Sequence, residues 1–272
     1  FDRGYGHFTT RQNIQFNWPK LSETPDILEA LADVEMHAIQ TSGNCIRNVT
    51  SDPLAGATAD EIADPRPTAE LLRQWSSLHP EVTYLPRKFK IAVTGSPNDR
   101  TATRFHDIGL RMLRNEAGET GYEVLVGGGQ GRTPVIAEVL RSFLPSARLL
   151  DYLEALMRVY NLHGRRDNKY KARIKILVRE LGIEAFRDQV EAEFENAPTS
   201  SVTLAQAELE RIDSFFLPPT FADLPSYSIE HEAAKAANPE FAQWVESNVL
   251  PHKQSGYAIA MVTLKAIGAI PG

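Results

Sequence analysis

The chain contains a single cysteine, Cys45, among 272 residues. An internal disulfide is therefore excluded, as is a four-thiolate iron–sulfur site or a cysteine-rich zinc site built from this chain alone. Such a fold must be held by a hydrophobic core, and 42% apolar residues over this length suffice for one large or two small domains. The lone thiol also favours a reducing compartment, and we predict a cytoplasmic location.

Charge and hydropathy narrow the classes of function. The net charge of −6 argues against general nucleic-acid binding. No run of about 18 apolar residues predicts a membrane span, and the first residues lack the basic-then-apolar order of a secretion signal. The seven histidines are scattered, with no pair at i, i+4. We therefore predict no metal site in this chain.

Hydrophobic periodicity predicts an α+β fold with mixed sheets and helices. The predicted strands are Thr10–Phe16, Phe89–Thr94, a hairpin of Ile108–Arg114 with Tyr122–Val126, and Gly256–Leu264. The predicted helices are Pro25–Gln40, Thr68–Leu78, Leu149–Leu162, Asn168–Leu181 and Ile183–Asn196. Residues 197–238 are acidic and dotted with prolines, and we predict that they connect two repeats. The last predicted strand is expected to find its partners mostly outside this chain.

The sharpest local pattern is a predicted strand on which lysines alternate with large apolar residues. Phe89, Ile91 and Val93 would face a core, and Lys88 and Lys90 would share the opposite face. Two ammonium groups one pleat apart repel each other, which favours an anion between them. The alternative is an edge strand whose lysines prevent aggregation.

Two further segments carry arginine among hydrogen-bonding side chains. The turn over Thr41–Thr50 contains Arg47, whose planar guanidinium suits carboxylates and oxyanions. On the first predicted strand, Arg11, Asn13 and Gln15 share a face with long reach, suited to a ligand with several carboxylates. The alternatives are an ordinary loop after a helix and a strand face exposed to solvent.

Seven cations and one anion lie between Arg165 and Arg179. On the helix predicted here, Arg166, Lys169 and Arg173 would form one stripe at i, i+3 and i+7. Neighbouring like charges destabilise a helix, so the pattern favours a polyanionic partner over a merely solvated face.

A run of glycines, residues 127–131, follows the predicted hairpin. It lacks the third glycine of a dinucleotide-binding pattern and the Gly-Lys-Ser/Thr of a phosphate loop. Because glycine has no side chain, the backbone of such a run can approach another group closely. Such a flexible segment after a strand would allow the backbone to approach a flat ligand closely.

Taken together, five segments resemble the sirohaem-dependent sulfite and nitrite reductase family. Each motif is weak alone, but their joint occurrence in the family's order is specific, and the likeness runs from about His7 to the C-terminus. The segments are Thr9–Gln15 (Thr-Thr-Arg-Gln-x-x-Gln), Asn44–Val49 (Asn-x-x-Arg-Asn-Val), Leu85–Lys90 (Leu-Pro-Arg-Lys-Phe-Lys), Val126–Gly129 (Val-Gly-Gly-Gly) and Asp167–Lys175 (Asp-x-Lys-x-x-x-Arg-x-Lys).

The resemblance implies a module repeated twice, each copy a ferredoxin-like half-module followed by a larger mixed α/β module, with sirohaem between the copies. We expect the N-terminal half of a longer protein. The expected parts are the remainder of the first ferredoxin-like half-module (1–43), the first sirohaem-binding domain (44–196), a connecting segment (197–250) and the start of the second half-module (251–272). The cysteines that hold a 4Fe–4S cluster would lie in the second copy.

The resemblance also implies roles for individual residues. Four match positions that contact the sirohaem, the last of them at the sirohaem or the substrate: Arg11, Gln15, Arg87 and Arg173. Three match positions that hold the oxyanion substrate and take part in catalysis: Arg47, Lys88 and Lys90. Apart from Gln15 and Arg87, we expect these side chains to converge on one open concave surface.

The implied activity is the six-electron reduction of sulfite to sulfide at sirohaem coupled to a 4Fe–4S cluster. Electrons would come from ferredoxin or a flavoprotein, and this chain alone is expected to be inactive without the C-terminal half. Sulfite is favoured over nitrite because Lys90 stands where nitrite reductases tend to carry asparagine. The alternatives are a nitrite reductase of the same family and a non-catalytic module for anion binding or assembly. Paired cysteines downstream would support an enzyme.

Overall fold

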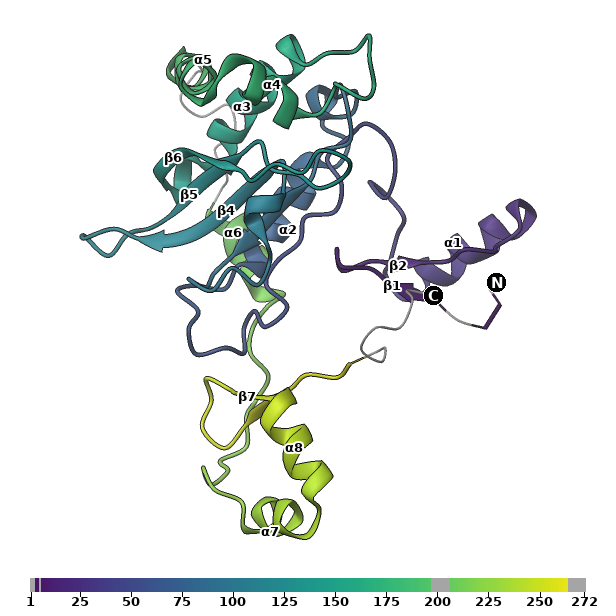
Figure 1. Ribbon diagram of the computed structural model, residues 1–272, viewed down its shortest axis with the longest axis vertical. Coiled ribbons are helices and arrows are strands. Elements are labelled where there is room, and N and C mark those ends of the chain that lie inside the picture. The colour runs from purple at the N-terminus through teal and green to yellow at the C-terminus, as the bar shows by residue number, and fades with distance from the viewer. Residues whose placement is uncertain (1–2, 5, 197–205, 264–272) are drawn as a thin grey trace.

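The computed structural model describes residues 3–4, 6–196 and 206–263, and its centre is a four-stranded mixed sheet in the order β3-β4-β5-β6 (Figure 1). β3 runs parallel to β4, and the other neighbours are antiparallel. Two small hairpins, β1–β2 and β7–β8, lie outside this sheet. The strands are β1 (His7–Phe8), β2 (Ile14–Gln15), β3 (Ile91–Thr94), β4 (Ile108–Arg114), β5 (Thr120–Val126), β6 (Glu138–Pro145), β7 (Val249–Pro251) and β8 (Ala258–Ala260).

Eight α-helices are described. They are α1 (Thr24–Ala32), α2 (Arg66–Ser76), α3 (Leu149–His163), α4 (Ile174–Leu181), α5 (Ile183–Asn196), α6 (Gln206–Ser214), α7 (Ile229–Ala237) and α8 (Pro239–Asn248). Figure 1 shows α3, α4 and α5 grouped on one side of the sheet, and α7 and α8 with β7 in a group of their own. Over the described residues, no helix has the length and apolar composition needed to cross a membrane.

One hydrophobic core joins the sheet to its helices. Phe89, Ile91 and Val93 are fully buried in it, as the alternation predicts. The ring of Phe89 lies 5.4 Å from that of Tyr160 on α3, and α2 contributes Leu72. Burial of such side chains contributes roughly 1.5–3 kcal/mol each. The approach to β3 is therefore rigidly placed, and Lys88 and Lys90 are placed with it.

The pattern of alternation was misleading at two strands. Residues 9–13 form a tight turn, in which the amide of Thr9 donates to the carbonyl of Asn13 and Gln12 has a left-handed conformation (φ 54°). The predicted strand Thr10–Phe16 is therefore wrong except for β2. β6 was not predicted because a bulge shifts its register against β5, so that its buried residues, Leu140 and Leu144, lie four apart.

The hairpin β4–β5, α3 and α5 are confirmed, and α2 begins and ends two residues before its prediction. Two predicted helices are wrong over part of their length. The first ends at Ala32, because Glu35 adopts φ 59° and the amide of Met36 turns back to the carbonyl of Leu31. α4 begins only at Ile174, because the side chain of Asn168 accepts from the backbone of Tyr170 and forms a turn instead.

The C-terminal part differs from its prediction as well. The proposed connecting segment 197–238 contains α6 and α7, although residues 197–205 lie outside the described part. Of the predicted strand Gly256–Leu264, β8 forms and pairs with β7, so one of its partners lies within this chain. Further partners outside the chain stay a prediction. Leu264 lies outside the described residues.

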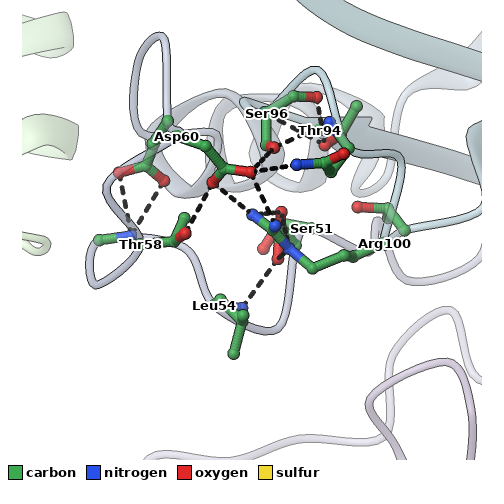
Figure 2. Close-up of polar contacts among 12 residues, drawn as sticks. Ser51, Leu54, Thr58, Asp60, Thr94, Ser96 and Arg100 are labelled. Atoms are coloured by element: carbon green, nitrogen blue, oxygen red, sulfur yellow. Dashed lines mark hydrogen bonds and ion pairs between the residues drawn. The ribbon is translucent and has the colours of Figure 1, made fainter. Parts of the chain in front are cut away.

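A polar network ties the loop before α2 to the loop after β3 (Figure 2). The carboxylate of Asp60 accepts from Ser96 at 2.7 Å and from Arg100 at 2.9 Å, and hydrogen bonds from Arg100 first of all lower the pKa of Asp60. Arg100 also donates to the buried Asp52, which accepts from the backbone amide of Leu54 at 2.8 Å. These two loops are thereby fixed to each other.

Candidate functional site

Five cationic side chains from separate segments gather where the chain enters β3. We call them the cationic cluster: Arg11 from the β1–β2 turn, Arg47 from the loop before α2, Lys88 and Lys90 from the residues before β3, and Arg173 from the residue that precedes α4. Arg173 and Arg47 both lower the pKa of Lys88, and Arg11 and Arg173 lower that of Lys90. The structure thus brings together all five residues that the sequence predicted to converge.

Backbone pairing explains how Arg47 reaches the lysines. The amide of Phe89 donates to the carbonyl of Cys45 at 3.0 Å, and the amide of Arg47 donates to the carbonyl of Phe89 at 2.8 Å. Further along, the amide of Thr50 donates to the carbonyl of Ile91 at 3.2 Å. This loop covers the outer side of β3, so the alternative of an open edge strand with protective lysines is wrong.

Arg11 and Arg47 are both held by oxygens of the chain. Arg11 Nη2 donates to the carbonyl of Asn48 at 2.5 Å, and burial first of all lowers the Arg11 pKa to about 10. Its Nε is buried without a partner among the described residues. Arg47 donates from Nη1 to Thr41 and from Nε and Nη2 to Gly43. Two of its five N–H donors remain for another acceptor.

Desolvation and crowding act together on the two lysines. Burial is the main cause that lowers the pKa of Lys90 to about 8, followed by the charges of Arg11 and Lys88. The pKa of Lys88 is lowered for the same first reason, followed by Arg173. An anion among these groups would relieve their repulsion and favour the charged forms.

A buried carboxylate, Asp107, lies among these cations, and the sequence reasoning missed it. Its side chain is 0% exposed and forms a 2.6 Å ion pair with Arg173. Burial first of all raises the Asp107 pKa, and Arg173 opposes this. No sequence signal identified Asp107, because the residue it pairs with lies 66 positions away.

Two further residues beside the cluster, Lys175 and His106, were not predicted as site residues. Lys175, 7% exposed, donates to the carbonyls of Gln130 and Thr133 at 3.0 and 2.5 Å, and so anchors the glycine run. Burial lowers its pKa. His106 has its pKa lowered to about 4, again mainly by burial, and its Nδ1 lies 2.8 Å from the carbonyl of Ala102. The imidazole is therefore neutral at physiological pH.

The glycine run makes a close approach to the chain itself. A Cβ on Gly128 would lie 2.4 Å from the carbonyl oxygen of Arg104 and 2.6 Å from that of His106. A Cβ on Gly129 would lie 2.9 Å from Nη2 of Arg173. The run therefore needs glycine to pack beside the cluster, and contact with a flat ligand stays a prediction.

Gln15 and Arg87 have different surroundings. Gln15 is exposed on β2 and its Nε2 donates to Asn17 at 2.5 Å. Arg87 is half-buried and lowers the pKa of Lys88. Among the described residues, no group of three or more His, Cys, Asp or Glu side chains is arranged to hold a metal ion.

The predicted basic stripe is wrong, because its residues precede α4. Arg165 forms a 2.6 Å ion pair with Asp167, and Arg166 donates to the carbonyl of Tyr84 at 2.8 Å. Two of the cations assigned to a polyanionic partner thus have partners within the chain.

The lowered pKa of Lys90 gives a testable pH dependence. Sulfate keeps its charge over the range that matters, and Lys90 is a cation below about pH 8 and neutral above it. We expect the affinity of the chain for sulfate to fall by about tenfold as pH rises from about 7 to about 9, because a charge-assisted hydrogen bond is lost. Calorimetric titration measures this, and Lys90→Gln should flatten the profile. A profile unchanged by that substitution would contradict the assignment.

Comparison with known proteins identifies the family to which this chain belongs. The family model described as nitrite and sulphite reductase 4Fe-4S domain matches residues 42–197, and that described as nitrite/sulfite reductase ferredoxin-like half domain matches residues 1–34. The first match covers more than half of the chain. The chain therefore belongs to the nitrite and sulfite reductase family.

Relatives within the family carry both substrate names. Sulfite reductase (ferredoxin) 1 of Mycolicibacterium paratuberculosis is 33% identical over 72% of this chain and 35% of its own length. The assimilatory ferredoxin-dependent nitrite reductase of Haloferax mediterranei is 34% identical over 71% of this chain and 34% of its own length. The chain thus spans about a third of the length of these relatives.

Solved structures agree with this membership. The Mycobacterium tuberculosis NirA protein has a TM-score of 0.67 and 30% identity, over 73% of this chain and 36% of its own. Dissimilatory sulfite reductase I has a TM-score of 0.57 over 87% of this chain and 71% of its own. At 12% identity, the second likeness supports the fold alone.

Proposed function

We propose that this chain forms part of an assimilatory-type sulfite reductase, in which the cationic cluster binds the oxyanion. The observation that carries the proposal is the convergence of Arg11, Arg47, Lys88, Lys90 and Arg173. Asp107 compensates only one of these five positive charges, and crowding of the others is unfavourable unless a further anion compensates it. Sulfite, with up to two negative charges and three oxygens, matches a surplus of donors.

The donor set also fits the cofactor that the resemblance implies. Sirohaem carries several carboxylates, and the buried Nε of Arg11 and the remaining N–H groups of Arg47 are suited to donate hydrogen bonds to such groups. Arg87 and Arg173 would add positive charge, and Gln15 an amide. When bound, sirohaem coupled to a 4Fe–4S cluster would pass electrons from an external donor to the substrate. Cys45 alone cannot hold that cluster, so its ligands would come from the remainder of the protein.

Within the site, Arg47, Lys88 and Lys90 would orient the substrate oxygens. Reduction of sulfite consumes protons, and a general acid works best with a pKa near the working pH. Lys90, with its pKa lowered to about 8, is suited to donate a proton to the substrate and to be reprotonated by solvent. Ferredoxin or a flavoprotein would be the electron donor, and the reaction would take place in the cytoplasm.

The proposal is tested on the full-length protein with a chemical reductant, by comparing kcat/KM for sulfite and for nitrite. Sulfite should be preferred, and Lys90→Asn should lower the sulfite to nitrite ratio by about tenfold, because one charge-assisted bond is lost with the more highly charged substrate. A preference for nitrite that Lys90→Asn leaves unchanged would favour the second candidate, a nitrite reductase. That candidate is supported by the relative from Haloferax mediterranei. Turnover of neither ion would indicate a non-catalytic anion-binding module.

A further inference from the structure

One carboxylate connects the separate segments of the cationic cluster. Asp107 is fully buried, and its charge raises the pKa of Arg11, Lys88 and Lys90. It stands at the entry to β4, next to Ile108, whose amide donates to the carbonyl of Lys90 at 3.2 Å. The start of β3 and the start of β4 thus meet at this acid.

The two oxygens of Asp107 bind different segments. Oδ1 accepts from Nε and Nη2 of Arg173 at 2.9 and 2.6 Å. Oδ2 accepts from the backbone amide of Lys90 at 2.9 Å. A planar guanidinium held through two adjacent nitrogens has a fixed orientation. The orientation of the remaining Nη1 group of Arg173 is therefore fixed. The backbone of Lys90 is fixed relative to it, because both are bound to the same carboxylate.

We infer that Asp107 is a positioning residue, which orients Arg173 and Lys90 so that both donate to one oxyanion. The inference rests on the proposed function for the identity of that anion. It concerns an acid and not one of the cationic contacts that the resemblance implies. By its charge alone, an acid at this place should repel the substrate.

The charge of Asp107 and its positioning role predict opposite effects on anion binding, so the inference can be tested. If Asp107 acted only through its charge, Asp107→Asn would strengthen anion binding, because one negative charge is removed near the site. If it orients Arg173 and Lys90, the same variant weakens binding, because the side-chain amide has only one oxygen. Its NH2 group then faces either the Arg173 guanidinium or the Lys90 backbone amide, and that donor loses its acceptor. Arg173→Lys keeps the charge but loses the planar fork, and should have the same effect.

The matched control is Asp52, a buried acid with the same pattern of partners. It accepts from Arg100 and from one backbone amide, that of Leu54. Asp52→Asn therefore reproduces the loss of an acid–arginine pair without changing Arg173. Its thermal unfolding gives the part of any effect that is due to stability alone.

The experiment is a calorimetric titration with sulfite and with sulfate at one pH. It compares the unaltered chain with Asp107→Asn, Arg173→Lys, the double variant of these two, and Asp52→Asn. Asp107→Asn and Arg173→Lys should each weaken binding by about tenfold, and the double variant should be no weaker than either by more than about twofold. Asp52→Asn should bind as the unaltered chain does. Unchanged or tighter binding by Asp107→Asn, or full additivity in the double variant, would overturn the inference. If Asp107→Asn does not fold, the test rests on Arg173→Lys. An affinity of that variant equal to that of the unaltered chain would overturn the inference.

A second readout separates this inference from the proposed function. The NMR resonances of the Arg173 Nε–H and of the Lys90 amide should move in Asp107→Asn and stay in Asp52→Asn, and the pKa of the Lys90 amine should fall, because a carboxylate that raises it is gone. An unaltered chain that binds neither anion would count against the proposed function, and the resonances would still decide the positioning. Resonances that do not move in Asp107→Asn would refute it.

Discussion

Replacing Lys88 with alanine is expected to lower kcat/KM for sulfite by about 100-fold in the full-length reductase proposed above. The charges of Arg173 and Arg47 both lower the pKa of Lys88, and Lys88 precedes the buried Phe89, which fixes its place. A donor held at a fixed position interacts with charge that develops on the substrate without the cost of reorganisation, which explains the size of the effect. Steady-state kinetics with a chemical reductant measures it.

The control is Lys171→Ala, an exposed lysine in the segment before α4. It removes the same charge from the protein at a site outside the cationic cluster, and should change kcat/KM by less than about twofold. Equal losses in the two variants would mean that only net charge matters. Arginine at position 88 should restore part of the sulfite affinity, because it keeps the charge but not the shape of the ammonium group.

Gly128→Ala is expected to lower the free energy of unfolding of this chain by about 3 kcal/mol or more. The added methyl group would lie 2.4 and 2.6 Å from two carbonyl oxygens, those of Arg104 and His106, and neither belongs to a flexible side chain. The backbone of residues 104–106 or of the glycine run must therefore move, and Asp107 and Arg173 would move with it. Urea unfolding followed by circular dichroism measures the loss.

Gly118→Ala is the matched control, because the tip of the β4–β5 hairpin has open space around it. Apart from its two chain neighbours, no residue has an atom within 4 Å of a Cβ at Gly118, although its φ of +80° imposes backbone strain. We expect a cost of about 1–2 kcal/mol from that strain. If Gly128→Ala costs no more than this, the loop has room that the structure does not show. Sulfate affinity should also fall in the first variant only.

The parts of the fold that could be predicted from sequence are those in which one short segment determines its own structure. Alternation around Phe89 and in the β4–β5 hairpin predicts buried strand faces, and the apolar period of α3 and α5 predicts helices. β6 and the start of α4 could not be found in this way. A bulge disrupts the first pattern, and a side-chain turn at Asn168 competes with the helix at the second.

The candidate site shows the same division. Arg11, Arg47, Lys88, Lys90 and Arg173 were identified because each stands in a motif of the resemblance, and the structure brings them together. The contacts that hold them had no local signal. Asp107 pairs with Arg173, which lies 66 positions away. Lys175 stands in one of the motifs, but its contacts with carbonyls 42 to 46 positions away were not predicted. Such pairs are created by tertiary packing, which periodicity in a single sequence does not describe.

The long separation between Asp107 and Arg173 also sets an order of events when the chain is made. Ribosomes add roughly 5–20 residues per second, so the carboxyl group is synthesised on the order of 3–13 s before the arginine that will neutralise it. During this interval β3 and β4 exist without the partner that makes burial of Asp107 favourable. We expect this edge of the sheet to close only after the segment leading into α4 has emerged, so that a nascent chain stalled before residue 173 remains open there.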